Sequence, residues 1–379
     1  MNRGRGGDRA GYQARRAQDT APGGTGPLQP SVPTGKWLFR GSDGRLTAYG
    51  CAGRGLLRWT ESTPAGGWTG PEELDVPGWT GLVAMAQSNE GYIHFVTLRA
   101  ATDGSGGQEI AVATQFQSGR GLTDWRSLGT PGVRGGPTED GPACPPCIAV
   151  NQRSGAVHVI VSLRHGGIVR RSRNAEGVWG GWKQIAPDPY PGEVTAVMPA
   201  GGPLEILAAG PAGIDRWVGA AQGQFRLGDR IATRMVGAPV GCETGPRRAT
   251  YFWRHPGDGS LVAWRAGHPG VQSGMMGLGG AGGRGTPGVG QALVGGYDCT
   301  VLAQNGADGD VELTAYVSEN EGYGIWWASL GGRGLHAPQV AVDDAGRIVV
   351  AAVGESGALA VARQDTTQQG LAFGPWQRA

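Results

Sequence analysis

From residue 35 onward, short apolar alternations recur along the chain, and each is followed by a polar turn centred on glycine and by a second alternation. Residues 84–96, 148–161 and 337–353 are the clearest copies of this pattern. Apolar and polar positions that alternate on both sides of a glycine turn predict a β-hairpin. We therefore expect each repeat to begin with two paired strands.

The second half of the repeat is also recognisable. A third apolar run often ends near Arg-Trp, as at Trp59, Trp217 and Trp264, and a shorter run with Trp and Gly follows it. The chain itself finishes on such a run, Gly374-Pro375-Trp376-Gln377. These features predict a third and a fourth strand in each unit.

Seven such units can be counted, with a period of about 43 to 58 residues, close to the size of a four-stranded propeller blade. They span approximately 35–80, 81–136, 137–194, 195–237, 238–290, 291–336 and 337–379. No segment carries an apolar stripe of helical period. We predict an all-β fold, a single β-propeller of seven four-stranded blades that closes without an exchanged strand. Six or eight blades are the alternatives, because units 4 and 5 are degenerate.

Composition supports many short strands joined by tight turns. Glycine and proline supply 73 and 25 of the 379 residues, a level at which disorder is a real alternative. The 13 Trp, 8 Tyr and 6 Phe argue against disorder, since disordered chains are poor in aromatic residues. Glycine then serves the turns, and the aromatic residues serve the core.

Residues 1–34 have no apolar periodicity and are expected to form a flexible, disordered tail rich in Arg, Gly and Pro. They hold five Arg and two Asp, a charge of +3, so the remainder of this +2 chain is about −1. A nearly neutral body argues against nucleic-acid binding. No signal peptide or membrane span is apparent, so we expect a cytoplasmic protein without a membrane partner, with export by a non-Sec route as the alternative.

The repeat resembles that of the bacterial seven-bladed, fucose-binding lectins of Photorhabdus type. The resemblance lies in the first hairpin turn at Asp43-Gly44-Arg45-Leu46 and in the Trp179-Gly180-Gly181-Trp182 motif. It implies that simple sugars bind in pockets between neighbouring blades and that the protein is not an enzyme. Unit 5 departs from the pattern because it lacks the fourth-strand Trp, and unit 2 has an insertion at 102–108.

The recurring Arg-Trp positions are the candidate sugar-binding sites. An aromatic plane packs on the C–H face of a sugar ring, while Arg and Asp hydrogen-bond its hydroxyls. The candidates are Arg58, Trp59, Asp215, Arg216, Trp217, Trp264 and Arg265. The competing interpretation is that each Trp fills a gap between blades, and for any single Trp it is the favoured one.

The cysteines predict no cofactor. Their number, five, is odd, and one CxxC at Cys144 and Cys147 is a weak signal for a redox or metal site. Cys147, Cys242 and Cys299 fall near predicted first strands, so they could converge on a central channel. We favour small buried residues instead, since a buried free Cys behaves as a small hydrophobe.

Three functions are compatible with these patterns. The first is a carbohydrate-binding propeller with sites between blades and a glycan as its partner. The second is a non-catalytic protein-interaction subunit, tethered to a larger assembly through residues 1–34. The third is a glycosidase or lyase acting at the central channel, for which Glu243 and Asp298 are the best carboxylates; the first strands offer few others, and no catalytic residue is assigned.

Overall fold

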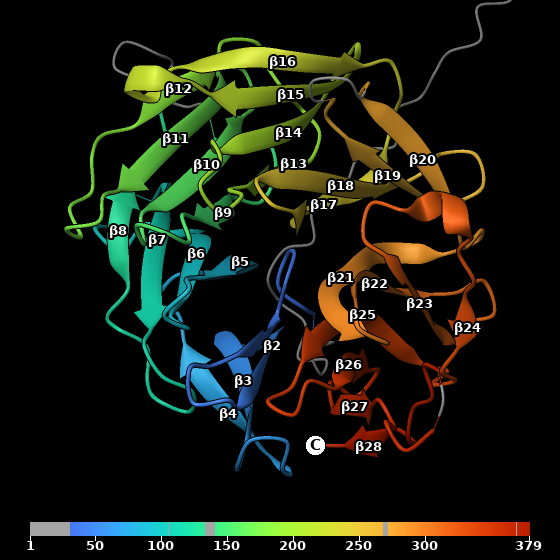
Figure 1. Ribbon diagram of the computed structural model, residues 1–379. Helices are drawn as coiled ribbons and strands as arrows, with labels where there is room; N and C mark the ends of the chain where they lie inside the picture. The colour runs from blue at the N-terminus through green and yellow to red at the C-terminus, as the bar shows by residue number, and fades with distance from the viewer. Residues whose placement is uncertain (1–30, 105, 133–140, 268–271, 369) are drawn as a thin grey trace, which may run out of the picture.

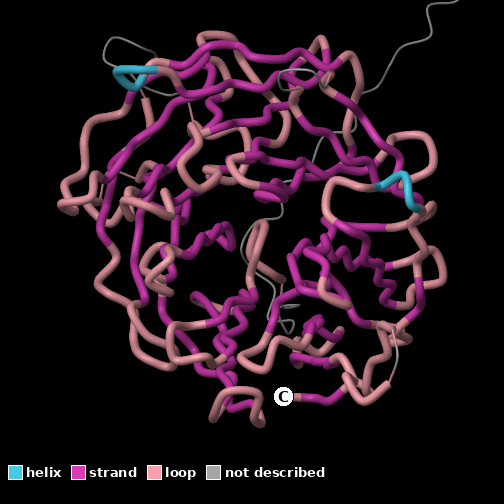
Figure 2. Tube along the Cα trace, viewed as in Figure 1, coloured by secondary structure: helices cyan, strands magenta, loops and turns pink. Residues whose placement is uncertain are grey.

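The computed structural model describes residues 31–379 apart from 105, 133–140, 268–271 and 369. The described chain forms seven four-stranded antiparallel sheets, arranged as blades around a central axis (Figure 1). Within these residues, the only helical turns are η1 (Ala221–Gly223) and η2 (Glu321–Tyr323), both of 3-10 type (Figure 2). The prediction of an all-β, seven-bladed propeller is confirmed.

Each blade uses four strands that are consecutive in the chain. Blade 1 has β1 (Leu38–Arg40), β2 (Leu46–Ala52), β3 (Gly55–Glu61) and β4 (Trp68–Asp75). Blade 2 has β5 (Trp79–Gln87), β6 (Ile93–Ala100), β7 (Gln108–Gln115) and β8 (Arg126–Gly129). Blade 3 has β9 (Cys147–Val150), β10 (Val157–Leu163), β11 (Gly167–Arg173) and β12 (Lys183–Ala186). Blade 4 has β13 (Val194–Val197), β14 (Glu205–Gly210), β15 (Gly213–Gly219) and β16 (Phe225–Ile231).

The remaining three blades follow the same plan. Blade 5 has β17 (Val236–Gly245), β18 (Arg248–Arg254), β19 (Leu261–Arg265) and β20 (Gly274–Gly279). Blade 6 has β21 (Arg284–Val294), β22 (Tyr297–Asn305), β23 (Val311–Val317) and β24 (Ala328–Ser329). Blade 7 has β25 (Leu335–Val342), β26 (Ile348–Gly354), β27 (Leu359–Arg363) and β28 (Gln377–Arg378). Blade 6 thus begins at Arg284 rather than at residue 291, and blade 2 at Trp79 rather than at residue 81.

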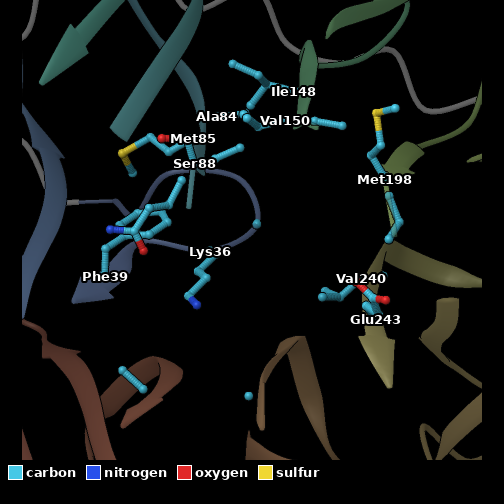
Figure 3. Close-up of a pocket in the computed structure, with 18 of the residues that line it drawn as sticks. Lys36, Phe39, Ala84, Met85, Ser88, Ile148, Val150, Met198, Val240 and Glu243 are labelled. Atoms are coloured by element: carbon cyan, nitrogen blue, oxygen red, sulfur yellow. The ribbon is translucent and has the colours of Figure 1, made fainter. Parts of the chain in front are cut away.

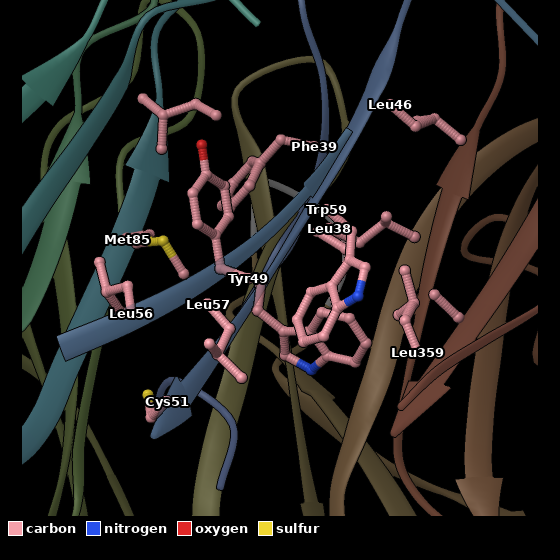
Figure 4. Packing of buried hydrophobic residues seen from close by; sticks show 14 of the residues in the cluster. Leu38, Phe39, Leu46, Tyr49, Cys51, Leu56, Leu57, Trp59, Met85 and Leu359 are labelled. Atoms are coloured by element: carbon pink, nitrogen blue, oxygen red, sulfur yellow. The ribbon is translucent and has the colours of Figure 1, made fainter. Parts of the chain in front are cut away.

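The middle strands of a blade are buried on both faces, because a blade is packed between two neighbours. Every residue of β10 is buried, and β6 and β26 are buried along nearly their whole length. Such strands carry nearly continuous apolar runs rather than clean alternation, as strands covered on both faces do. The core consists of six clusters of buried hydrophobic residues, most of them spanning neighbouring blades, and one of these clusters joins blades 7, 1 and 2 (Figure 4).

The tryptophan just before the fourth strand ties one blade to the previous one. The indole Nε1 groups of Trp182, Trp327 and Trp376 donate to backbone oxygens at 3.2, 2.8 and 2.8 Å. The acceptors are carbonyls of a leucine one blade earlier, Leu128, Leu278 and Leu330. The Trp-containing fourth strand of the repeat therefore has a structural role, since it orders the contact between blades.

The ring closes without an exchanged strand, because blades 1 and 7 each contain four strands of their own. An ion-pair cluster joins them instead. Arg363 of β27 lies 2.5 Å from a carboxylate oxygen of Glu61 in β3 and 3.4 Å from one of Asp343. Both carboxylate side chains are completely buried. The Glu61 side chain also accepts the backbone N–H of Leu46 at 2.8 Å, so the closure depends on a buried and partnered charge.

The end of the expected tail contacts the propeller. Ser31 exchanges two backbone hydrogen bonds with Cys51 of β2, at 3.1 and 2.7 Å, and the N–H of Thr34 donates to the carbonyl of Val83 at 2.9 Å. Residues 31–34 therefore contact the second strand of blade 1 and the first strand of blade 2. The rest of the tail predicted over residues 1–34 lies outside the described residues.

Arg363→Met should lower the free energy of unfolding by about 3–5 kcal/mol, because it leaves the buried carboxylates of Glu61 and Asp343 with one partner fewer. Adding Glu61→Gln should recover part of this loss, since Gln keeps an oxygen that accepts the N–H of Leu46 without carrying a charge. Urea denaturation measures both variants. Arg378→Met, at an exposed position, is the control and should change stability by less than about 0.5 kcal/mol. An Arg363→Met variant as stable as this control would contradict the proposed role in closure.

Candidate functional site

The structure places two of the three candidate tryptophans in the interior. Trp59 and Trp264 are 1% and 3% exposed, because their strands β3 and β19 are covered on both faces. Figure 4 shows Trp59 within its cluster of buried residues. Neither ring presents a face to solvent. At these two positions the gap-filling interpretation describes the observed packing, and a sugar could stack on them only if the blades separated.

The arginines beside these tryptophans are occupied by protein groups. Arg58, 2% exposed, donates to the carbonyls of Gly119 and Arg120 in blade 2 and pairs with Glu72. Arg265 makes two bonds, of 2.6 and 2.7 Å, to Glu321 in blade 6. Both guanidinium groups therefore serve the contact with the next blade.

The blade 4 candidates do not converge on one site. Asp215 and Trp217 share a face of β15, where both contact the hydroxyl of Tyr190, at 2.8 and 3.0 Å. Arg216 points to the opposite face, where it pairs with Glu205 at 2.6 Å and with Asp229 at 2.9 Å. Successive side chains of a strand lie on opposite faces of the sheet, so neighbours in sequence end up in different interfaces.

The carboxylates considered for an enzyme are also apart. Glu243 lies on β17 at the channel, and its two oxygens accept the backbone N–H groups of Ala200 and Arg247 at 2.7 and 2.8 Å. Asp298 lies on β22, the second strand of blade 6. The structure thus does not bring these two groups together as an acid and base pair.

All five cysteines are free thiols. Cys147 and Cys242 lie on first strands, whereas Cys299 lies on a second strand, so the three do not converge on the channel. Burial raises the pKa of the Cys242 and Cys144 thiols to about 12, which keeps them protonated near neutral pH. Across the described parts of the chain, no cluster of three or more His, Cys, Asp or Glu side chains is suited to hold a metal.

A pocket between blades 2 and 3 combines aromatic, cationic and acceptor groups. Its volume is about 350 Å³, and it is lined by β6, β7 and β8 of blade 2 and by β9, β10, β11 and the following turn of blade 3. Its polar and aromatic lining residues are His94, Phe95, Thr114, Phe116, Thr123, Asp124, Arg126, Arg173 and Trp179. None of them was among the sequence candidates, although the pocket lies where the lectin resemblance places sugar sites, between neighbouring blades.

Arg173 stands out because blades 1 and 7 place a hydrogen-bond acceptor at its position. It pairs in register with Val157, the first residue of its blade's second strand. At the equivalent position Glu61 accepts the N–H of Leu46 at 2.8 Å in blade 1, and Gln364 accepts that of Ile348 at 3.1 Å in blade 7. Arg173 substitutes a donor there, and its buried Nε has no hydrogen-bond partner among the described residues. Burial lowers the pKa of this guanidinium, which marks a charge without full compensation.

His94 contributes a neutral imidazole to the same pocket. Its Nδ1 lies 3.0 Å from the hydroxyl of Thr114, its cross-strand partner. Burial, and then the positive charge of Arg173, lowers the pKa of His94 to about 4. The imidazole is therefore uncharged at neutral pH, and the charges that line the pocket come from Arg126, Arg173 and Asp124.

Blade 3 repeats this histidine without repeating the pocket. His158 pairs with Ser172, whose hydroxyl lies 2.8 Å from its Nδ1. Its Nε2 is buried without a hydrogen-bond partner, and burial lowers its pKa to about 4. On the same side of the blade, the Arg170 guanidinium lies over the ring of Phe225 in blade 4, 5.1 Å from the centroid. Phe225 therefore helps to fill the interface between blades 3 and 4, whereas the one between blades 2 and 3 stays open.

Sequence reasoning missed this pocket because it followed the Arg-Trp end of the third strand. The Trp179–Trp182 motif was noted, and Trp179 lines the pocket. Only the strand register aligns Arg173 with Glu61 and Gln364, because the third strands of blades 5 and 7 also end in arginine.

Comparisons with known proteins identify the fold. No family model and no curated protein matches the sequence. Among solved structures, a protein from Lactobacillus plantarum is similar, with TM-score 0.58, 14% identity, and coverage of 92% of this chain and 96% of that chain. A prolyl endopeptidase is similar with a TM-score of 0.52 and 10% sequence identity, and the match covers 93% of this chain and 50% of that chain. The SapL1 lectin, solved in complex with alpha methyl fucoside, has a TM-score of 0.47 and 14% sequence identity. That match covers 77% of this chain and 95% of the lectin chain.

Likenesses at such low identity show the propeller fold alone. The narrower resemblance to the Photorhabdus-type lectins remains a prediction. Among the residues that the structure describes, no helix has the length and apolar character needed to cross a membrane.

Trp217→Ala should lower the free energy of unfolding by about 2–4 kcal/mol, because it opens a cavity beside Tyr190 and removes an indole hydrogen bond. Trp326→Ala is the matched control, since this tryptophan is 75% exposed, and it should cost less than about 1 kcal/mol. Thermal and urea unfolding measure both variants. Equal, small effects would show that Trp217 does not act as a packing residue.

His158→Gln should flatten the dependence of stability on pH. The folded pKa, about 4, lies below the unfolded value of 6.5, so acidification protonates the unfolded chain first and destabilises the fold. Relative to this variant, the wild type should lose about 1–3 kcal/mol between about pH 7 and about pH 4.5. His336→Gln, at an exposed position, is the control and should follow the wild-type curve. Parallel curves for wild type and His158→Gln would rule out a neutral, buried His158.

Proposed function

We propose that this protein is a carbohydrate-binding propeller whose site is the pocket between blades 2 and 3. The single observation that carries the proposal is the pairing of Trp179 with the incompletely bonded Arg173 in one pocket. A polar group buried without a partner costs free energy, and such groups are retained mainly where something else requires them. A ligand hydroxyl that accepts from Nε of Arg173 would supply the missing bond.

The chemistry of the pocket fits a sugar. Trp179 and Phe116 offer apolar ring surface, and Phe116 is half exposed. The C–H face of a sugar packs on such surfaces, while Arg173 and Arg126 donate to hydroxyl oxygens and Asp124 accepts from hydroxyl hydrogens. The volume of 350 Å³ lies at the small end of the range for ligand pockets. We therefore expect the pocket to hold one or two sugar units rather than a long chain.

The role assigned to the pocket is binding. Neutral His94 and a single carboxylate, Asp124, do not form the pair of carboxylates that glycoside hydrolysis generally uses. The competing hypothesis is a protein-interaction subunit tethered by residues 1–34. A glycan array on which the wild-type protein binds nothing would overturn the carbohydrate proposal and favour that alternative.

Arg173→Met tests the assignment of the site. It should weaken binding of any glycan found on the array at least about tenfold, the size of one charge-assisted hydrogen bond. Stability should change by less than about 1 kcal/mol, because the removed Nε–H has no protein partner. Calorimetric titration measures the affinity, and urea unfolding measures the stability.

Arg170→Met is the matched control, because Arg170 lies on the same strand but on the opposite face, over Phe225. It should leave the affinity for the glycan unchanged. If both variants bind as the wild type does, the glycan occupies another site; if both lose binding equally, the loss comes from a general disturbance of blade 3.

A further inference from the structure

The first strands of all seven blades enclose a central channel with a cavity of about 760 Å³ (Figure 3). Its lining mixes polar groups with apolar side chains, and Met198 and Val240 are the partly exposed apolar residues among those labelled in Figure 3. Like the pocket between blades 2 and 3, this space is not filled by side chains. It is therefore a second place where a small molecule fits.

Four charged side chains line this cavity: Lys36, Arg40, Glu243 and Asp344. Arg40 donates to the carbonyl of Asp343 at 3.0 Å, and Glu243 accepts two backbone N–H groups. Asp344 is exposed in the turn between β25 and β26.

The Lys36 ammonium differs from the other three groups. Within the described residues, it makes no hydrogen bond and no ion pair, and it lies 5.6 Å from the centre of the Phe39 ring. Its side chain is accessible from the channel, yet protein surrounds it, and this burial lowers its pKa. A cation without an anionic partner is thus held near one aromatic ring inside a cavity.

We propose that the central channel binds a small organic carboxylate, whose anionic end pairs with Lys36 and whose apolar body packs against the partly exposed side chains of Met198 and Val240. One unpaired ammonium balances one negative charge, so a monoanion fits better than a phosphate dianion. The carboxylate of Glu243 on the same wall also disfavours additional negative charge. The apolar side chains account for the preference for an organic anion over an inorganic one.

The composition of the chain makes a direct test available. Of its 33 basic residues only two are lysines, Lys36 and Lys183, and Lys183 lies exposed on β12. Limited acetylation with acetic anhydride, followed by peptide mass spectrometry, therefore reports on the channel and on an internal control in one sample. Benzoate is the probe, because it joins one carboxylate to a flat apolar body, and benzamide is its neutral counterpart.

Benzoate at about 20 mM should slow acetylation of Lys36 about tenfold, as expected for a dissociation constant near 2 mM. The rate at Lys183 should not change. The midpoint of the pH dependence at Lys36 should rise when benzoate is present, because a bound carboxylate favours the charged ammonium. In calorimetry, Lys36→Met should abolish the benzoate signal and Lys183→Met should keep it.

Three results would overturn the proposal: no protection of Lys36 by benzoate, equal protection by benzamide, or stronger protection by inorganic phosphate. The experiment is independent of glycan binding, because none of the charged residues of the pocket between blades 2 and 3 lines the channel. Arg173→Met should therefore leave the protection of Lys36 unchanged, whatever it does to a glycan.

Discussion

Face-to-face packing of blade on blade is the interaction on which this structure depends. A four-stranded sheet cannot stand alone with two apolar faces, and a ring of seven blades covers both faces of each one. Any polar group in such an interface needs a partner from its own blade or from the next. The interface arginines Arg58, Arg216 and Arg265, of which Arg58 is fully buried, follow from this requirement. Each is bonded to carboxylates or carbonyls there.

Ring closure is the most demanding of these interfaces, because its two sides are distant in sequence. The contact between Arg363 and Glu61 spans 302 positions, and no exchanged strand supports it. A buried ion pair adds little net stability to a protein, because the cost of removing both charges from water offsets their attraction. Removing only one partner lowers the free energy of unfolding much more, because it leaves a buried charge unpaired.

Function is expected where this packing is incomplete. Between blades 3 and 4 the ring of Phe225 helps to fill the space, whereas between blades 2 and 3 an arginine occupies a position where blades 1 and 7 place an acceptor, and a pocket remains. Packing is also incomplete at the central channel, where the first strands of the seven blades enclose a cavity that their side chains do not fill. Both proposed sites combine a cavity with an incompletely partnered cation. Nε of Arg173 has no hydrogen-bond partner among the described residues, and the Lys36 ammonium has no ion-pair partner there.

The sequence by itself determined the all-β class and the four-stranded repeat, because short apolar runs and glycine turns are local signals. It favoured seven blades but left six or eight open, and the structure shows seven. The sequence did not determine which side chains face a pocket. Asp215, Arg216 and Trp217 are adjacent in sequence, but strand geometry sends them to different blade interfaces, where their partners are Tyr190 and Glu205. Only the tertiary structure decides whether a neighbouring blade fills the space beside a side chain, because the atoms that fill it lie tens of residues away.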